Sequence, residues 1–476
     1  MPPSLRRLAR ALSRQGISVA LSGHVYTFSR PGSTDAQVLL PEGFAVEAKA
    51  VRQLLAFSGV RHPSGGRVVA AKATPDFHPG STVPVGAVVV TTPDLVVPQA
   101  IGTDIQCGMR LHTAELDLDT FQAGRDRFVA LLRRDLLMGG RDLPLHRDTM
   151  RNALQHGIVG FLDSLRDPRH RMGALLASDV DQLDAEVDTA VAGMGSADGD
   201  LSWAPEDLLP TDRTVLRDGY LGTVGGGNHF VEIQVVDEVL DRKAAWRMQP
   251  GLQRGRICIM VHTGSRQVGQ AIGRRWAERA VELWPKHVRR PASGILPLHG
   301  PAARSYLGAM NTAANYGAVN RMLVAELVRL RLREVYGTDL AVPLVYDAPH
   351  NLVFEENGHF VHRKGATPAH ADQPVLIPGS MGHPSYLMRG LGNRDFVSSA
   401  SHGAGRALTR FEMARRKRLG LDLGLACVDC ITLKEERRIE EAPAAYKDID
   451  AVVDVQVQQG IVAPVARLRP LLSVKS

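Results

Sequence analysis

The sequence predicts an α/β (α+β) protein, formed by one large domain with mixed sheets around a central two-metal site. Three observations support this prediction. The second half of the chain alternates apolar strand patterns with helical patterns. The 476 residues contain no linker rich in proline, serine or glycine that would separate domains. Five short polar segments with potential metal ligands lie scattered between residues 102 and 406, and their convergence would make most of the chain one unit.

The first half of the chain predicts a short helix, a group of strands and then two helical stretches. Residues 4–14 carry leucines on one helical face and arginines elsewhere, which is typical of a surface helix. From Val68 to Met109, apolar runs alternate with Gly/Pro turns and predict strands. Helical patterns follow at about 121–136 and 174–191, and Gly193–Pro210 is a loop by composition.

In the second half, polar residues repeatedly follow apolar strands. The expected elements are strands at Ile257–Val261, Leu344–Tyr346 and Val375–Ile377, and helices that run to about Trp284 and over about Thr312–Val335. The strands lead to His262, His350 and Pro378–Gly382, respectively. The ends of strands are the usual place for functional sites in α/β proteins.

Composition indicates a soluble protein of a reducing compartment. The 57 basic and 50 acidic residues give a net charge of +7, which permits a polyanionic partner such as nucleic acid without requiring one. Four cysteines are too few for a disulfide framework. The most apolar stretch, Val85–Ile101, is interrupted by polar residues and prolines, so it does not predict a membrane span. We therefore expect a cytoplasmic protein without a membrane partner.

Five potential metal ligands lie in glycine-rich or strand-end segments. Asp104 and Cys107 are three residues apart in a glycine-flanked turn, while His229, His262 and His350 lie in the segments GGGNHFVE, VHTGSRQVG and APHN. A single buried cysteine is more often a small hydrophobe, and each histidine alone could be a structural polar residue. The complete set is too large for one catalytic zinc ion with an open position, and it suits two divalent ions that share the cysteine thiolate.

His402 lies in a different setting, the small-residue segment Ser401–Arg406 (SHGAGR). Backbone N–H groups at Gly403 and Gly405 could surround a phosphate, and we expect the Arg406 guanidinium to contact phosphate oxygens of RNA. A neutral imidazole beside a metal-held phosphate is a candidate covalent nucleophile. From the residues alone, a fourth histidine ligand or a structural turn remains possible.

Other segments carry less information. Cys427 and Cys430 form an isolated C-x-x-C pair without partner ligands, which favours a structural interpretation. Lys475 near the chain terminus is expected to be a solvated surface charge. The segment GTVGGG at Gly222–Gly227 lacks the lysine of a phosphate-binding P-loop.

Eight segments together resemble the RtcB-type RNA ligase family over roughly Pro75 to Lys475. The matching segments are Pro75–Gly80 (PDFHPG), Gly102–Met109 (GTDIQCGM), Gly222–Ile233 (GTVGGGNHFVEI), His262–Gly269 (HTGSRQVG), His362–Ala366 (HRKGA), Ile377–Gly382 (IPGSMG), His402–Arg406 (HGAGR) and Tyr446–Val452 (YKDIDAV). The resemblance implies an α/β catalytic domain particular to this family. It also implies GTP- and manganese-dependent joining of RNA 2′,3′-cyclic phosphate or 3′-phosphate ends to 5′-hydroxyl ends.

The same resemblance implies roles for individual residues. Asp104, Cys107 and His229 would hold one manganese ion, and Cys107, His262 and His350 the other. His402 would attack the α-phosphate of GTP, become guanylylated and pass GMP to RNA, which gives an RNA-(3′)pp(5′)G intermediate. The positions implied for nucleotide binding are Asn228, Glu232, Asn351, Pro378, Gly379, Ser380, Met381, Ser385, Gly403, Ala404, Gly405, Tyr446 and Lys475.

We expect residues 1–60 to form an N-terminal segment partly unlike the family, and residues 61–476 to form the catalytic domain. A variable, acidic helical and loop region is expected at about 113–220 within it. Two other functions are compatible with these residues: a metal-dependent RNA cyclic phosphodiesterase or phosphatase without ligation, and a non-catalytic RNA-binding module. The sequence identifies neither the RNA nor an activating protein partner.

Overall fold

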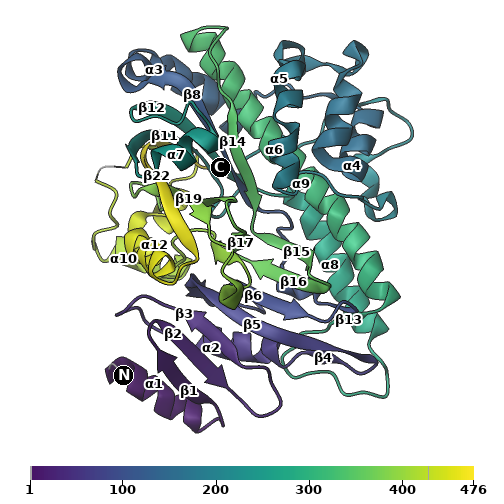
Figure 1. The fold of residues 1–476 in the computed structure, drawn as a ribbon. Coiled ribbons are helices and arrows are strands. Elements are labelled where there is room, and N and C mark those ends of the chain that lie inside the picture. Colours follow the sequence, from purple (N-terminus) through teal and green to yellow (C-terminus); the bar gives the residue numbers. More distant parts are fainter. Residues whose placement is uncertain (1–2, 427) are drawn as a thin grey trace.

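Two large sheets organise the protein, and a layer of helices around the long helix α9 covers them on one side (Figure 1). The structure is a computed structural model that describes residues 3–426 and 428–476. Most strand pairs within these residues are antiparallel, while β3 with β5 and β21 with β22 are parallel. The mixed α/β architecture predicted from the sequence is therefore confirmed.

The first sheet contains the N-terminal strands and a hairpin from the second half of the chain. Its order is β1-β2-β3-β5-β6-β16-β15, and β4 pairs with β5 beside this path. The strands are β1 (Ser18–Ser22), β2 (Val25–Ser29), β3 (Ala36–Leu39), β4 (Arg61–His62), β5 (Gly65–His78), β6 (Val85–Thr91), β15 (Asn351–Glu356) and β16 (His359–Lys364). Helices α1 (Pro3–Ser13) and α2 (Ala48–Ser58) accompany it.

The second sheet has the order β14-β8-β12-β11-β22-β19-β18, with β21 paired to β22. The strands are β8 (Gly108–Asp117), β11 (Phe230–Val239), β12 (Arg256–Thr263), β14 (Leu344–Pro349), β18 (Pro374–Ile377), β19 (Ser385–Gly390), β21 (Cys430–Ile431) and β22 (Val462–Val474). Three small pairs complete the strands: β7 (Leu95–Val96) with β13 (Leu298–His299), β9 (Leu145–His146) with β10 (Val215–Leu216), and β17 (Ala366–Pro368) with β20 (Ser399–Ser401).

Helix α9 (Pro301–Tyr336) is the centre of the helical layer. Its 36 residues span about 54 Å, and its middle is buried against α3, α4, α8, β8 and β12. The helices of this layer are α3 (Leu118–Leu132), α4 (Arg147–Leu165), α5 (Val180–Ala185), α6 (Val187–Ala192) and α8 (Arg266–Leu283). The remaining helices are α7 (Arg242–Met248), α10 (Arg410–Arg418), α11 (Glu435–Glu440) and α12 (Ile449–Gln458).

Several predicted element bounds were wrong for local reasons. The long helix starts at Pro301 rather than near Thr312, because Gly300 adopts a positive φ as its N-cap and proline suits the first helical position. The stretch predicted as one helix at 174–191 is split into α5 and α6. Helix α4 was not predicted, since Gly157 and Gly160 lower helix propensity and Gly157 breaks the helical dihedral angles at φ +62°.

No helix among the described residues is long and apolar enough to cross a membrane.

A buried arginine connects the two strands of the β15–β16 hairpin to the segment that precedes His402. Arg363 donates to Glu356 at 2.6 Å and to Ser399 Oγ and the Val397 carbonyl at 2.9 and 3.0 Å. The Arg363 side chain is fully buried. Burial raises the pKa of Glu356, but His370 and Arg363 lower it more, to a net value of about 2.

We expect Glu356→Gln to destabilise the fold at neutral pH by about 1–3 kcal/mol, because it leaves the buried Arg363 charge without its partner. Since the folded-state pKa is depressed, the contribution of Glu356 is fully present above pH 4.5 and is lost as the pH falls towards 2. Urea unfolding of both proteins across this pH range measures the difference.

The neighbouring Glu355→Gln is the matched control. Glu355 pairs with Arg304 on the surface, where both side chains are 56% exposed, so its removal should change stability by less than about 1 kcal/mol. Equal effects of the two substitutions would contradict the role of the buried pair.

Candidate active site

The predicted metal ligands converge because four adjacent strands of the second sheet each have one terminus on the same side of that sheet. In the order β14-β8-β12-β11, antiparallel pairing places the C-terminal ends of β14 and β12 beside the starts of β8 and β11. His350 follows β14, Cys107 precedes β8, His262 lies near the end of β12 and His229 precedes β11. The register then pairs Met109 with His262 and His262 with Phe230.

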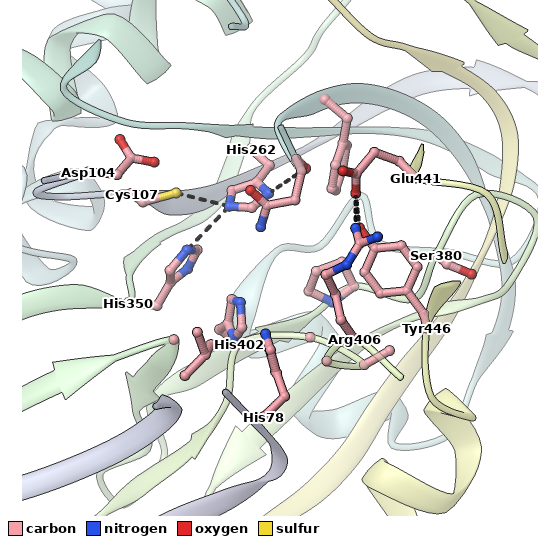
Figure 2. A pocket seen from close by; sticks show the side chains of 18 of the residues that line it. His78, Asp104, Cys107, His262, His350, Ser380, His402, Arg406, Glu441 and Tyr446 are labelled. Atoms are coloured by element: carbon pink, nitrogen blue, oxygen red, sulfur yellow. Dashed lines mark hydrogen bonds and ion pairs between the residues drawn. The ribbon is translucent and has the colours of Figure 1, made fainter. Parts of the chain in front are cut away.

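The first group of donor atoms contains Cys107, His262 and His350. Cys107 Sγ lies 3.1 Å from His262 Nε2, which lies 3.2 Å from His350 Nε2 (Figure 2). All three residues are buried. This spacing allows one ion to contact all three atoms.

The second group shares the cysteine and adds Asp104 and His229. Cys107 Sγ lies 3.3 Å from His229 Nε2, which lies 2.8 Å from Asp104 Oδ2. The two groups are the sets predicted for two cations with a shared thiolate, and within each group all ligand atoms lie within 4.8 Å of one another. Their role as ligands stays a prediction.

The histidines are oriented as metal ligands usually are. Nδ1 of His229 donates to the Val224 carbonyl and Nδ1 of His262 to the Asn228 carbonyl, both at 3.1 Å. These bonds fix the tautomer in which Nε2 carries a lone pair directed at the group. Burial, followed by neighbouring histidines, lowers the pKa values of His262 and His350 well below 6.5. Both imidazoles are therefore neutral, as coordination requires.

A bound cation would also offset the negative charge of the Cys107 thiolate. Burial raises the pKa of this thiol well above 9, and the Asp104 carboxylate raises it further. Thiolate, imidazole and carboxylate together fit divalent transition metals. Manganese in particular rests on the family resemblance, since the donor set alone would also suit zinc.

Two polar residues of α9 hold the ligand-bearing loops in place, and sequence reasoning missed both. Arg321 is fully buried and bonds to Asp347, to the Gln106 carbonyl and to the Thr263 carbonyl. Asn320 donates to the Thr263 hydroxyl and the Gly264 carbonyl and accepts from Gly222 N–H at 2.8 Å. Adjacent Asn and Arg in an otherwise apolar stretch of helix were the available signal.

Gly264 is required by close packing at the same point. A Cβ there would lie 2.6 Å from Asp104 Oδ1 and 3.0 Å from the Cys107 Cα. Any side chain at position 264 would therefore displace the second donor group.

His402, the predicted nucleophile, follows β20 and lies next to the first donor group. The centroids of the His402 and His350 rings are 4.6 Å apart. His402 Nδ1 lies 2.6 Å from Oδ2 of Asp76, which is fully buried in β5 and also accepts from Thr74 Oγ1. Burial raises the pKa of Asp76, but His402 and Thr74 lower it more, so the carboxylate is ionised. Asp76 thus accepts a hydrogen bond from His402 Nδ1, and Nε2 is the ring nitrogen that the carboxylate does not contact.

A cavity of about 450 Å³ opens beside these groups, a volume suited to a nucleotide. The predicted nucleotide-binding residues that line it are Asn228, Glu232, Asn351, Pro378, Gly379, Ser380, Met381, Gly403, Ala404, Gly405, Tyr446 and Lys475. Ser385 does not line it: its buried hydroxyl accepts from Gln234 at 2.9 Å and from Gly379 N–H at 3.3 Å. Ser385 therefore supports the Pro378–Met381 segment from behind.

Lys475 contradicts the expectation of a solvated surface charge. It is 4% exposed, lies over the Phe230 ring and donates to the His229 carbonyl at 3.3 Å. Burial lowers its pKa, whereas the nearby carboxylates of Glu441 and Glu232 raise it. Lys475 directly follows β22, which pairs with β11 inside the second sheet, and this pairing brings the lysine into the site. Periodicity in the sequence does not indicate which strands pair.

Arg406, predicted to contact an RNA phosphate, is held at the opposite wall of the cavity by the Glu441 carboxylate and by the Glu440 and Leu408 carbonyls. It donates to Glu441 at 2.9 Å, and the Tyr446 hydroxyl also bonds to Glu441 (Figure 2). Its guanidinium stacks over the Tyr446 ring at 5.3 Å. The arginine is therefore positioned before any ligand binds.

Sequence reasoning missed four further residues that matter to the cavity: Asp76, Glu441, His78 and Lys364. His78 bonds through Nδ1 to the Asp76 carbonyl at 2.7 Å, and burial lowers its pKa to about 4. Burial also lowers the pKa of Lys364 to about 8. Asp76, His78 and Lys364 lie in the matched segments PDFHPG and HRKGA, which was the available signal.

Only one cysteine of the Cys427–Cys430 pair lies among the described residues. Cys427 lies outside the described residues, and Cys430 is a half-buried residue of β21.

Fold and site define a mixed α/β protein with two linked Cys/His/Asp donor groups at the wall of a nucleotide-sized cavity. A family profile described as tRNA-splicing ligase RtcB matches residues 62–476. The chain is 37% identical to the RNA-splicing ligase RtcB of Mycobacterium tuberculosis, with 86% of this chain and 98% of the relative covered. It is 30% identical to the tRNA-splicing ligase RtcB of Archaeoglobus fulgidus, with 94% and 96% covered. The chain belongs to the RtcB family.

We expect the wild-type protein to bind two Mn²⁺ ions, and substitution of single ligands to separate them. Asp104→Asn should weaken the binding of one ion and His350→Ala that of the other, each by about tenfold or more. Cys107→Ala should weaken the binding of both ions, because its sulfur belongs to both groups. Equilibrium dialysis followed by elemental analysis measures the stoichiometry.

The surface group His146, Asp148 and His170 offers a control, since its donor atoms also lie within 4.8 Å of one another. His146→Ala should leave the count of two unchanged. A loss of bound metal in this variant, with none in Cys107→Ala, would show that the ions bind elsewhere.

Proposed function

We propose that this protein joins RNA 2′,3′-cyclic phosphate or 3′-phosphate ends to 5′-hydroxyl ends, with GTP and two manganese ions, in RNA splicing or repair. Its relatives are named as RNA-splicing and tRNA-splicing ligases, and the chain is an RNA ligase of that family. The nucleotide, the metal and the RNA ends are the finer part of the proposal.

The observation that carries the proposal is the Asp76–His402 pair between the donor groups and the cavity. Asp76 Oδ2 accepts a hydrogen bond from Nδ1 at 2.6 Å, so Nε2 is the ring nitrogen available as a nucleophile. Among the described residues, His402 belongs to neither donor group, and it lines the nucleotide-sized cavity together with Gly403 and Gly405. This arrangement therefore favours the nucleophile over the fourth-ligand and turn interpretations of His402.

In the first step, His402 Nε2 attacks the α-phosphorus of GTP. The N–P bond forms as the bond to pyrophosphate breaks, and the ring becomes cationic because Nδ1 keeps its proton. The Asp76 carboxylate offsets this new charge without a proton transfer. The manganese ions, when bound, would offset negative charge on the phosphates.

In the later steps, GMP passes from His402 to the RNA. An oxygen of the RNA 3′-phosphate attacks the phosphorus, and His402 leaves as a neutral imidazole, which gives RNA-(3′)pp(5′)G. The 5′-hydroxyl of the second RNA end then attacks the 3′-phosphate and releases GMP. A cyclic phosphate would first be opened by water.

The guanylate would be held by the opposite part of the cavity. Glu232 is buried and accepts from Ser473 and Gln234 at 2.5 and 2.6 Å, so its carboxylate is fixed and able to accept guanine N–H groups. Buried Lys475 and the Arg406–Glu441–Tyr446 group surround the same space. Lys364 lies near His402 as a cation for phosphate oxygens.

The test uses GTP labelled at the α-phosphate, with manganese and without RNA. We expect covalent labelling of the wild type and none of His402→Ala, because the proposal makes His402 Nε2 the atom that forms the N–P bond. The surface variant His287→Ala should label like the wild type, since His287 is exposed and does not line the cavity.

Joining assays with defined RNA ends complete this test. Joining of 3′-phosphate to 5′-hydroxyl ends with GTP, and not with ATP, supports the proposal. Turnover of cyclic phosphate without GTP and without an adduct would identify a phosphodiesterase instead. RNA binding without turnover, in a protein that retains no transition metal, would identify a non-catalytic module.

We expect Asp76→Asn to slow labelling by GTP by about 10²-fold or more. The amide of asparagine can donate to Nδ1, which would move the imidazole proton to Nε2 and remove the nucleophilic lone pair. The rate of adduct formation at saturating GTP measures this effect, and binding of GTP itself should stay within about threefold of wild type.

Asp94→Asn is the matched control. Asp94 Oδ2 lies 2.9 Å from His299 Nε2 in a similar pair, and neither residue lines the cavity. Its labelling rate should equal that of wild type. If Asp76→Asn weakens GTP binding while the rate at saturation is normal, Asp76 does not orient the nucleophile.

A further inference from the structure

Helix α10 starts at the wall of the cavity and leads away from it over the surface. Its first residue, Arg410, lines the cavity and donates to Glu441 at 3.2 Å. The helix is fixed at this end by a capping box between Thr409 and Glu412. Its nine residues extend about 13.5 Å and lie near α12, on the side of the molecule opposite α8 and α9 (Figure 1).

The helix presents positive charge without matching carboxylates. Arg415, Lys417 and Arg418 are exposed, and none of them takes part in an ion pair with a carboxylate in the described part of the chain. Its single acidic residue, Glu412, is already used in the capping box. These three cations are therefore free to meet an external anion.

An aromatic side chain lies on the same face as two of the cations. Phe411 is 72% exposed, and it precedes Arg415 and Arg418 by four and seven residues, which places all three on one side of the helix. Leu419 and Leu421, just beyond the helix, are 61% and 47% exposed. An exposed aromatic ring among cations is typical of surfaces that bind single-stranded nucleic acid, because bases stack on the ring and phosphates pair with the cations.

The helix dipole explains only part of this pattern. Cations in the last turn are stabilised by the partial negative charge there, at about 0.3–1 kcal/mol each. That effect gives no reason for an exposed phenylalanine in the first turn. A membrane surface fits less well, since Phe411 is the one large apolar side chain that this nine-residue helix exposes, and it forms no broad apolar face.

We propose that Phe411, Arg415, Lys417 and Arg418 form a docking surface for the single-stranded RNA whose reacting end enters the cavity. The cations would pair with successive phosphates, and the Phe411 ring would stack on a base. The inference rests on the proposed function, and it adds where the substrate strand lies outside the cavity.

The test measures binding of a fluorescent single-stranded RNA with a 3′-phosphate, by anisotropy at several KCl concentrations. The variant Arg415→Ala/Lys417→Ala/Arg418→Ala should weaken binding at least tenfold at low salt. It should also flatten the plot of log affinity against log salt by about 2, since three lost phosphate contacts contribute about 0.7 each. Phe411→Ala should weaken binding about fivefold or more without changing the slope.

The matched control removes three exposed cations elsewhere: Lys286, Arg289 and Arg290, in the loop after α8. Lys286→Ala/Arg289→Ala/Arg290→Ala should leave RNA affinity and its salt dependence near those of wild type. An equal loss in this control, or an unchanged slope in the α10 variant, would overturn the docking surface. Binding of wild type to anionic lipid vesicles but not to RNA would overturn it as well.

Labelling by GTP without RNA separates this inference from the proposed function. The α10 variants should label as fast as wild type, because labelling involves no RNA. If wild type itself fails to label, the proposed function fails, while the RNA affinities still decide on the docking surface.

Discussion

The antiparallel register of β14, β8, β12 and β11 is the constraint on which the site depends. It brings the ends of four strands to one edge, where Cys107 meets a histidine 122 residues away and another 155 residues away. Arg321 and Asn320 of α9 then fasten the loops at this edge through buried hydrogen bonds to their carbonyls. A shift of one residue in any of these strands would turn its donor away from the others.

The second constraint is the packing of the first large sheet against the small β17–β20 pair. β5 of the first sheet carries Asp76, and β20 brings His402 against it, across 326 residues of sequence. Gly405 allows this approach, since a Cβ at that position would lie 2.3 Å from the Asp76 carbonyl. The orientation and tautomer of the imidazole are thus set by packing between distant strands, next to donor groups that would hold cations.

In the proposed reaction, the two ends of the nucleotide would meet different parts of the cavity. Lys364 would face the phosphates, and the buried Glu232 side chain would face guanine. The exposed cations of α10 lie outside the cavity, where we propose that the RNA strand docks. The nucleotide and the RNA strand would thus occupy different surfaces until their phosphates meet at His402.

The sequence by itself determined the fold class, the donor residues and some of the strands, among them β5, β6, β12, β14 and β18. It did not predict the N-terminal strands or the central strands β11 and β22. Each cysteine, aspartate or histidine alone could be a structural residue, and the ordered motifs together indicated the donor role. Long helices were recognised from periodicity, but α4 was missed because its two glycines obscure the helical pattern.

Only the tertiary structure decided how these residues cooperate. Asp76, Asn320 and Arg321 gained their importance from partners far away in sequence, and Lys475 is buried because β22 pairs with β11. Local periodicity reports which face of an element is apolar. It does not report which strands pair, and hydrogen bonds between strands are made wherever the register places them.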